Sequence, residues 1–332
     1  MGESISVAMC TRNGASYVGE QVASILRQEL LPDELIVSDD ASTDDTVAIV
    51  RSIFEELDPA SPAARVGLTV LENVDPLGVT KNFEQAVRAT SGDLIALCDQ
   101  DDRWHSDRLT RQAAEFESRK DLELLFTDAV LVGAEGNPLG FTLFESLELK
   151  SADIELIRDG HAFPLLLKRN LATGATIMFR RGLLTRALPF PLEWVHDEWL
   201  AIIGAATSRI DLLDEHLVDY RQHGSNEVGV RQPTLLVKMQ RVLEPRGDRN
   251  VLLAVRSQRL VERLDALSIE VSAKTLREAR TKTEVEAWRA ALPAHRLRRA
   301  GAILRADRRG WYADYCSQGR LDMVRDLLQP HR

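Results

Sequence analysis

The chain has 332 residues, of which 44% are hydrophobic and 28% are charged, and this composition excludes a disordered or collagen-like protein. Its formal net charge of −9 and its aromatic content of only 5% argue against a general nucleic-acid-binding protein. No apolar run reaches the ~18 residues that cross a membrane, and no basic segment precedes the first apolar one, so neither a membrane-spanning helix nor a secretory signal is expected.

The first half of the chain alternates two kinds of pattern. Short apolar runs with β-branched residues predict buried strands at residues 5–10, 34–38, 67–71 and 93–98. Between them, apolar residues recur at helical spacing in the segments 18–26, 47–57 and 79–87. Alternating strands and helices indicate βαβ units around a parallel sheet, in which ligands bind outside the carboxyl ends of the strands.

The second half is more mixed. Further strands are predicted at residues 122–132, 175–179, 210–213 and 217–220, and a helix at residues 198–206. From about residue 233 onward the pattern is helical and rich in Leu, Ala, Arg and Glu. We therefore predict an α/β domain over residues 1–230 and a helical C-terminal region over residues 231–332.

Four polar residues, Asp99-Gln100-Asp101-Asp102, follow the fourth predicted strand. Carboxylates are hard oxygen ligands for Mg²⁺ or Mn²⁺, and clustered carboxylates repel one another unless a cation or hydrogen-bond donors compensate them. The alternative is an acidic turn that caps the next helix, although a cap needs only one Asp. A metal site is therefore the favoured interpretation.

A second acidic turn follows the second predicted strand. Capping of the next helix accounts for Asp44 and Asp45, because acidic side chains are favoured at a helix N-terminus. Asp39 and Asp40 come earlier, at the strand tip, where a carboxylate can accept a hydrogen bond from a base N–H or a ribose hydroxyl. Polar side chains at several neighbouring strand ends suit a nucleotide or a metal ion.

In this order, these segments resemble family 2 glycosyltransferases of the GT-A fold, and the later ones resemble the rhamnosyltransferase-like branch of that family. The resemblance covers about residues 4–230 and implies a Rossmann-like nucleotide-binding sheet with flanking helices, followed here by a helical C-terminal extension. The matching segments are residues 7–14, 36–44, 82–86, 99–102, 174–181, 196–199 and 220–226.

The resemblance implies roles for individual residues. Thr11 and the pair Asp39 and Asp40 would hold the nucleoside. Asp99 and Asp101 match the DxD motif, which meets ribose, diphosphate and a divalent cation. The predicted contacts to the nucleotide sugar are Thr11, Arg12, Asn13, Asp39, Asp40, Lys81, Asp99, Gln100 and Gly174.

The predicted metal ligands are Asp99, Asp101 and His223, and the metal would be Mg²⁺ or Mn²⁺. His223 lies where some members of the family place a further metal or diphosphate contact, and imidazole suits Mn²⁺. The alternative is a histidine that lies on the surface or is satisfied by polar groups of the protein, without a metal. Arg12 departs from the family pattern, because many relatives have an aromatic residue there, and stacking on the base is therefore in doubt.

Asp197 matches the acidic residue that serves as catalytic base in inverting members, and the adjacent Glu198 is the alternative base. An inverting transfer needs one carboxylate near the acceptor hydroxyl to take its proton. Trp194 and Trp199 flank Asp197 in sequence and are candidates to line a sugar subsite. The other interpretation is that His196 and Asp197 simply cap the following helix.

The C-terminal segment is basic. Residues 286–332 contain ten arginines and five acidic residues, a net charge of +5, which leaves −14 for the rest of a chain whose total is −9. Apolar residues interleave with the arginines, among them Leu297, Leu304, Trp311 and Tyr312, as is typical of a helix that lies on an anionic membrane. The alternatives are a charged helix packed on the catalytic domain or on another subunit of a homo-oligomer.

These inferences predict an inverting, metal-dependent glycosyltransferase that moves one sugar from a nucleoside diphosphate to a hydroxyl acceptor. The resemblance favours dTDP-rhamnose over a UDP-sugar as donor, and a glycan or lipid-linked acceptor of a bacterial-type surface polysaccharide. Three scattered cysteines suit a cytoplasmic protein, at most peripheral at the inner face of the plasma membrane. The alternatives are a metal-dependent nucleotidyltransferase or phosphohydrolase, and a catalytically silent, membrane-associated scaffold.

Overall fold

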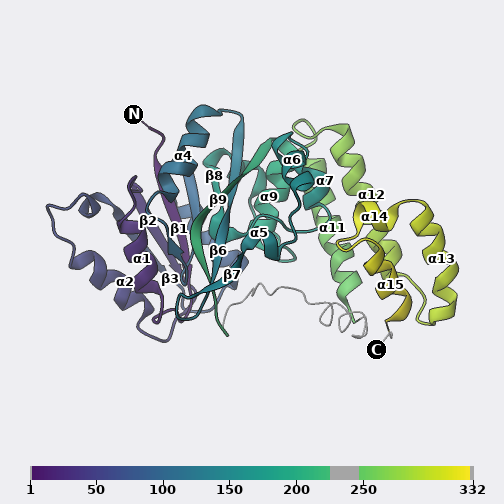
Figure 1. Ribbon diagram of the computed structural model, residues 1–332, viewed down its shortest axis with the longest axis horizontal. Helices are drawn as coiled ribbons and strands as arrows, with labels where there is room; N and C mark the ends of the chain where they lie inside the picture. The colour runs from purple at the N-terminus through teal and green to yellow at the C-terminus, as the bar shows by residue number, and fades with distance from the viewer. Residues whose placement is uncertain (1, 225–246, 330–332) are drawn as a thin grey trace. The chain divides into compact units, whose positions relative to one another are not determined.

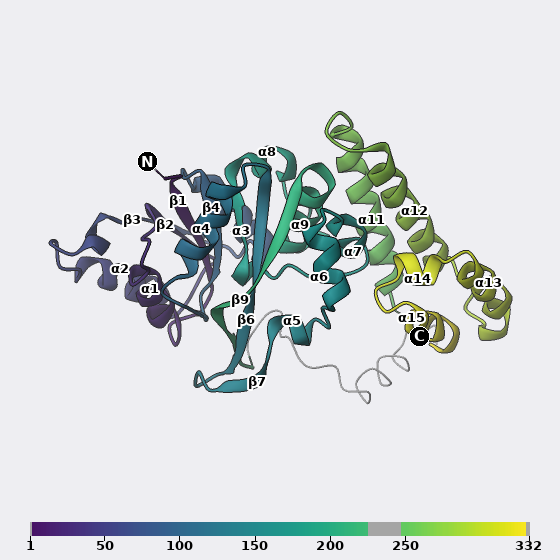
Figure 2. The same cartoon turned by 45° about the horizontal axis from the view of Figure 1, so that its top comes forward.

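The computed structural model describes residues 2–224 and 247–329 (Figures 1 and 2). The chain divides into two compact units, one of residues 1–160 and 171–230 and the other of residues 161–170 and 231–332. Three predicted features lie outside the described residues: the boundary between residues 230 and 231, the end of the matching segment 220–226, and the start of the helical pattern at 233. Within the described ranges, no helix is long and apolar enough to cross a bilayer.

The first unit is built on one nine-stranded sheet. Its strands are β1 (Ile5–Thr11), β2 (Glu34–Asp39), β3 (Gly67–Glu72), β4 (Leu94–Asp99), β5 (Arg103–Trp104), β6 (Leu122–Gly133), β7 (Pro138–Thr142), β8 (Met178–Arg180) and β9 (Arg209–Gln222). They lie in the order β3-β2-β1-β4-β8-β6-β9-β5, with β7 paired to β6. The first four strands run parallel, whereas β8 is antiparallel to both β4 and β6.

Helices and short 3₁₀ turns connect these strands. They are α1 (Val18–Leu26), α2 (Thr46–Glu55), η1 (Pro62–Arg65), α3 (Val79–Ala89), α4 (Arg108–Ser118), α5 (Leu143–Ser146), α6 (Ser151–Arg158), η2 (Gly174–Thr176), η3 (Arg181–Leu183), α8 (Leu184–Ala187) and α9 (His196–Thr207). Helix α3 packs on β1 and β2 and also on α9, which itself packs on β6 and β9 (Figure 2). The predicted α/β sheet with flanking helices is therefore confirmed.

The four strands and three helices predicted in the first half all form, with ends within two residues of the predicted ones. Their apolar runs are readable because every residue of β1 is buried and five of the six in β4 are buried. Strands covered on both faces carry such continuous apolar sequence. Side chains of these strands form one core with helix residues such as Val22 and Val50.

Two predictions in the second half are wrong. The strand predicted at 175–179 is a 3₁₀ turn followed by the three-residue β8, because the backbone N–H and hydroxyl of Thr176 both donate to the carbonyl of Thr173 at 2.9 Å. The strands predicted at 210–213 and 217–220 form one continuous strand, β9, which follows β6 across shifts of register.

The register of the parallel strands aligns their carboxyl ends. Thr11 lies opposite Asp39, Asp39 lies opposite Glu72, and Asp99 lies opposite Cys10, one residue before Thr11. Polar residues that are separated by up to 88 positions in the sequence therefore meet at one edge of the sheet, at the carboxyl ends of the neighbouring strands β2, β1 and β4.

The second unit is helical. Its helices are α7 (Ala162–Leu166), α11 (Arg249–Ala266), α12 (Ala273–Ala290), α13 (Arg296–Arg308), α14 (Trp311–Tyr315) and α15 (Arg320–Leu328). Helices α11 and α12 pack against each other, and α13 packs on α14 and α15. Val285, Ile303 and Tyr312 lie in a small separate core, with Trp288 and Trp311 against it. The helical C-terminal region is therefore confirmed.

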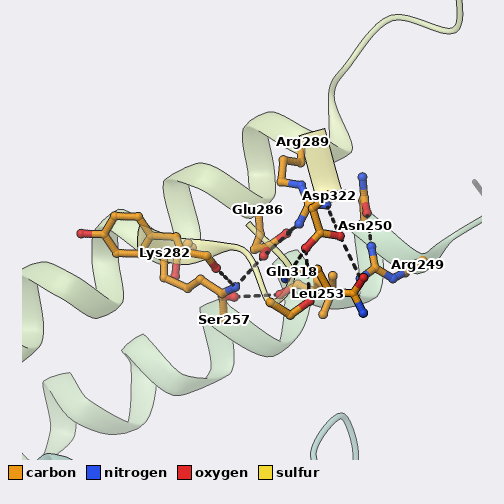
Figure 3. A network of polar contacts seen from close by, with 12 residues as sticks. Arg249, Asn250, Leu253, Ser257, Lys282, Glu286, Arg289, Gln318 and Asp322 are labelled. Carbon is orange, nitrogen blue, oxygen red and sulfur yellow. Dashed lines mark hydrogen bonds and ion pairs between the residues drawn. The ribbon is translucent and has the colours of Figure 1, made fainter. Parts of the chain in front are cut away.

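A buried ionic network joins α11, α12 and α15 (Figure 3). Arg289 is 1% exposed; its Nε donates to Asp326 at 2.7 Å, its Nη1 donates to Glu286 at 3.1 Å, and its Nη2 lies 3.5 Å from Asp322. Burial alone would raise the pKa of Asp322, but the Arg289 charge and the Gln318 N–H lower it on balance. Lys282 donates to Glu286 at 2.6 Å.

Replacing Arg289 by Leu is expected to destabilise the second unit by about 3–5 kcal/mol, because it leaves buried carboxylates without their cation. Urea unfolding followed by circular dichroism measures this change. Arg280→Leu is the control, since Arg280 forms an exposed ion pair with Asp265 at 2.7 Å and such pairs contribute about 0–1 kcal/mol. Equal effects of the two substitutions would contradict the importance of the buried network.

Candidate functional site

Asp39 organises the end of β2. Its carboxylate accepts from the hydroxyls of Thr11 at 2.7 Å and Ser42 at 2.6 Å, and from the Ser42 N–H at 2.8 Å. Asp39 is 2% exposed, so these donors compensate a carboxylate that is almost removed from water. The structure therefore places Thr11 and Asp39 side by side, as their predicted shared role at the nucleoside requires.

Asp40 ties the end of β2 to the start of α3. Its two oxygens accept from the backbone N–H groups of Leu77 at 2.5 Å and Gly78 at 3.0 Å. Gly78 has a φ of 79°, a left-handed conformation that favours glycine and turns the chain into the helix. Arg12 approaches the same carboxylate at 3.7 Å, with half of its side chain exposed.

Asn13 and Gln100 fix the loop that follows β1. Asn13 has a φ of 48°; its side-chain oxygen accepts from the Thr43 N–H at 2.9 Å, and its own N–H donates to Ser42. Gln100 accepts from the N–H of Arg12 at 2.8 Å and donates to the carbonyl of Arg12 at 3.0 Å. The loop after β1 is therefore held on one side to the β2 loop and on the other to the β4 loop.

Asp101, which follows β4, and His223, which follows β9, come together. Their Oδ2 and Nε2 atoms lie 2.6 Å apart, and both residues are largely buried. Tyr17 stacks on the His223 ring with centroids 4.7 Å apart. Arg221, next but one to His223, donates from its Nε to the carbonyl of Asp101 at 2.7 Å. Two of the three predicted metal ligands, Asp101 and His223, therefore lie in direct contact.

Asp102 and Arg108 lie directly behind this pair. Burial, followed by the charges of Asp101 and Asp99, raises the pKa of Asp102 well above its usual range. One Asp102 oxygen accepts from the Arg221 N–H at 3.0 Å, whereas the other has no hydrogen-bond partner among the described residues. Arg108 is fully buried against Trp104, and burial lowers its pKa to about 10 although the nearby acidic groups oppose this shift.

The donor set suits a cation that is shared with a bound phosphate group. Within residues 2–224 and 247–329, no three His, Cys, Asp or Glu side chains form a ready metal cluster. Asp101 and His223 offer one carboxylate oxygen and one imidazole nitrogen. Asp99 is the last residue of β4, two positions before Asp101. Mg²⁺ binds in this manner, through one or two carboxylates, waters and substrate phosphates. Asp99 as a third ligand stays a prediction.

Asp197 lies in the first turn of α9, 8% exposed. Its oxygens accept from the backbone N–H groups of Gly174 at 2.9 Å and Glu198 at 2.6 Å. These two bonds hold the carboxylate in one orientation. A Cβ on Gly174 would lie only 3.0 Å from the His196 Nε2, so glycine allows its segment to pack closely against the start of α9.

His196 lies beside Asp197 and is buried. Its ring stacks on Phe83 with centroids 3.7 Å apart, and neither ring nitrogen has a hydrogen-bond partner among the described residues. Burial lowers the pKa of His196 to about 3, so the imidazole is neutral at physiological pH. Of the two residues in the capping interpretation, His196 makes no side-chain hydrogen bond among the described residues, whereas Asp197 accepts from the Glu198 N–H in the first turn of α9.

Helix α3 connects the end of β2 with the segment that leads into α9. On one side, the amide of Asn82 donates to the carbonyl of Ser38 at 2.8 Å and accepts from its hydroxyl at 2.6 Å. On the other side, the hydroxyl of Thr80 donates to the carbonyl of Trp194 at 2.9 Å. The Lys81 ammonium donates to Glu84 and to the carbonyl of Phe190, both at 2.7 Å.

These contacts change two expectations. A contact between Lys81 and a diphosphate stays a prediction, and it would require the ammonium to exchange Glu84 or Phe190 for the phosphate. Trp199 is 1% exposed and its indole N–H donates to the carbonyl of Ala187 at 2.7 Å, so the idea that it lines a sugar subsite is wrong. Its spacing on α9 turns it into the core, where large aromatic side chains contribute most.

The sequence did not point to Tyr17, Thr80 or Arg108, and it contained Arg221 only as part of the matching segment 220–226. Tyr17, Arg221 and Thr80 act through contacts to residues that are distant in sequence, namely His223, Asp101 and Trp194. For these residues the sequence showed only the apolar spacing of the nearby helices, which does not indicate their partners.

Comparison with known proteins assigns a family. The model of glycosyl transferase family 2 matches residues 6–183, more than half of the chain. TuaG of Bacillus subtilis, assigned to teichuronic acid biosynthesis, is 31% identical over 135 residues, which are 41% of this chain and 50% of TuaG. RfbG of Shigella flexneri, a dTDP-rhamnosyl transferase, is 32% identical over 105 residues, 30% of this chain and 34% of RfbG. The chain thus spans about half or less of the length of these two relatives.

Solved structures support the fold. TarS of S. aureus, residues 1–349 in complex with UDP-GlcNAc, superposes with a TM-score of 0.53 at 18% identity, covering 98% of this chain and 90% of that one. The mannosyltransferase PcManGT of Pyrobaculum calidifontis, in complex with GDP-Man and Mn²⁺, gives a TM-score of 0.51 at 20% identity, covering 98% and 86%. The predicted GT-A fold is confirmed, and the chain belongs to glycosyl transferase family 2.

The buried neutral state of His196 predicts a pH dependence of folding. Because the pKa is about 3 in the folded protein and about 6.5 when unfolded, the unfolded state binds the extra proton first, and stability falls as the pH drops below about 6.5. Between about pH 7.5 and 5, protonation of His196 in the unfolded state is expected to lower the free energy of unfolding by about 2 kcal/mol. Urea unfolding at both pH values, with His196→Leu, measures it.

The His196→Leu variant is expected to lose about 2 kcal/mol less than the wild type over this range. His295→Leu is the control, because His295 is exposed and should leave the pH dependence unchanged. Identical pH profiles for the wild type and His196→Leu would contradict a buried neutral imidazole.

Proposed function

We propose that this family 2 glycosyltransferase moves one sugar from a nucleoside diphosphate to a hydroxyl acceptor, with inversion at the anomeric carbon. The observation that carries the proposal is the presence of two separate acidic sites. One is the pair Asp101 and His223 at the end of β4, and the other is the fixed carboxylate of Asp197 at the start of α9. Inverting transfer needs these two functions, leaving-group stabilisation and proton removal.

On the donor side, Thr11, Asp39 and Asp40 bind the nucleoside at the ends of β1 and β2. Asp39 and Asp40 are 2% and 3% exposed, and their carboxylates are oriented by the donors described above. Asn13 and Gln100 position the loop that carries Arg12, and Gly174 borders the sugar beside Asp197. Support comes from the strand register that aligns these ends.

Asp101 and His223 hold a divalent cation, Mg²⁺ or Mn²⁺, and Asp99 meets the cation or the ribose. Bound there, the cation would supply positive charge where negative charge builds up on the leaving diphosphate. The 2.6 Å approach of Asp101 to His223 supports this pair, because the two atoms that share a hydrogen bond can bind one cation instead. Arg221 and Tyr17 keep the His223 ring in place from outside.

Asp197 acts as the general base. Its two backbone donors hold the carboxylate in one orientation, and a carboxylate so placed can take the proton of an acceptor hydroxyl. Neutral His196, which fills the space between Phe83 and Gly174, adds no positive charge that would weaken this base. Glu198 is the alternative base, since it is the adjacent acidic residue on α9.

The donor proposed is dTDP-rhamnose, with a UDP-sugar as second choice. Rhamnose is supported by the similarity to the dTDP-rhamnosyl transferase RfbG, which covers 30% of this chain. A UDP-sugar is supported by the structure of TarS, which contains UDP-GlcNAc. The acceptor proposed is a glycan or a lipid-linked glycan of a surface polysaccharide, as the similarity to TuaG suggests. All three cysteines are free and buried, which supports a reducing cytoplasmic location.

Donor binding is expected to depend on a divalent cation and on Asp101. Thermal unfolding with dTDP-rhamnose and Mn²⁺ should show a higher Tm than with chelator, because a ligand that binds only the native state stabilises it. Asp101→Ala should abolish this shift while the unliganded Tm stays high enough to show a folded protein. The same shift in chelator as in Mn²⁺ would rule out the cation, and a larger shift with UDP-sugars would reverse the donor order.

Asp197→Asn is expected to lower sugar transfer by about 10²–10⁴-fold, the usual contribution of a general base, while donor binding survives. Asparagine keeps the size and the oxygen that accepts from Gly174, but it is not basic. Transfer is measured as glycosylated acceptor per enzyme, and donor binding as the thermal shift above. Loss of donor binding together with transfer would indicate a structural role instead.

Glu198→Gln is the matched control, because adjacent helix positions point about 100° apart and only one of the two side chains can face the acceptor. It should retain transfer. An inactive Glu198→Gln with an active Asp197→Asn would move the base by one residue, and full activity of both would overturn the single-base mechanism. Donor cleavage that needs no acceptor would favour a phosphohydrolase.

A further inference from the structure

The outward side of α13 in the second unit carries arginines and leucines together. Leu297 is 82% exposed and Leu304 is 54% exposed. They lie seven residues apart, which places them within about 20° of each other around the helix at 100° per residue. Arg308 lies about 20° from Leu297 around the helix, and Arg305 and Arg298 lie about 80° and 100° from it in the same direction. All three arginines are exposed.

The other side of α13 faces the core of the unit. Ile303 and Ala306 are buried there, and Arg299 is 0% exposed. The Arg299 guanidinium donates to the carbonyls of Ala294 at 2.6 Å, Asp326 at 2.9 Å and Gln329 at 3.0 Å. The helix is therefore fixed in rotation, and the surface of Leu297, Arg298, Gly301, Leu304, Arg305 and Arg308, here called the α13 face, points to solvent.

Folding separates the acidic from the basic side chains of the C-terminal segment, residues 286–332. Its acidic residues Glu286, Asp322 and Asp326 are 1–2% exposed and neutralise Arg289 and Lys282 inside the unit (Figure 3). Only two acidic residues of the segment, Asp307 and Asp314, are not buried. Most of its arginines remain outside, so the surface is more cationic than the net charge of the sequence indicates.

We propose that the α13 face docks on an anionic lipid bilayer. The arginines are complementary to lipid phosphates, and the two exposed leucines can enter the boundary between headgroups and acyl chains. Exposed leucines would not contribute to binding a nucleic acid, because such binding depends on cations that contact phosphates and on aromatic side chains that stack on bases. This inference goes beyond the proposed transfer reaction and does not depend on it.

The aromatic residues do not take part in this docking. Tyr312 is 1% exposed and its hydroxyl donates to Asp326 at 3.0 Å, while Trp311 packs against Trp288 with ring centroids 5.4 Å apart. The expectation that Trp311 and Tyr312 form an interfacial anchor is therefore wrong. Docking through arginines and two leucines is shallow and mainly electrostatic, and salt should weaken it strongly.

The test is sedimentation of the full chain with vesicles. Binding is expected to phosphatidylcholine vesicles that contain phosphatidylglycerol, to fall on adding salt, and to be absent with phosphatidylcholine alone. Each arginine near an anionic bilayer contributes about fivefold to partitioning, so the triple variant Arg298→Gln, Arg305→Gln, Arg308→Gln should bind about a hundredfold more weakly. Leu297→Ser with Leu304→Ser should also reduce binding.

A triple variant on α12, Lys274→Gln, Arg277→Gln and Arg280→Gln, is the matched control, because it removes three exposed cations of the same unit away from the α13 face. It should bind almost as the wild type does, and all variants should keep the wild-type Tm. Equal loss in both triple variants would show that net charge alone acts, and unchanged binding of the leucine variant would exclude insertion. Either result, or binding of an oligonucleotide but not of vesicles, overturns the proposal.

Discussion

The parallel pairing of β1 with both β2 and β4 is the constraint on which the site depends. It fixes the register in which Thr11 faces Asp39 and in which Asp99 ends beside Cys10. A slip of one residue would exchange the side chains that β1 directs to its two buried faces, so the packing on both faces protects this register. The position of the acidic groups is therefore a consequence of core packing, and the loops only refine it.

Buried polar contacts carry this order from the donor end of the sheet to the start of α9. Asn82 binds Ser38 just before Asp39, and two residues away Thr80 binds the carbonyl of Trp194. Because an unsatisfied buried polar group costs about 1–3 kcal/mol, such contacts favour one position of α3 over neighbouring ones. Helix α3 thus holds the proposed base and the proposed nucleoside site in a constant relation.

The second unit shows a different use of buried charge. Lys282, Glu286, Arg289, Asp322 and Asp326 satisfy one another inside a helical unit whose apolar core is small. Buried ion pairs contribute little net stability, but they specify one arrangement, because any other would leave a charge without a partner. The same arrangement determines which charges stay outside, and so it produces the cationic face of α13.

The sequence by itself determined the βαβ order, the ends of its first four strands, and the acidic residues that follow them, because strands buried on both faces carry unbroken apolar runs. It also pointed to Asp197 and His223. Only the tertiary structure decided which of these residues meet, since Asp101 and His223 are 122 positions apart. It likewise decided that Trp199, Tyr312 and Arg299 lie inside, because burial depends on what packs against a helix and not on the helix sequence alone.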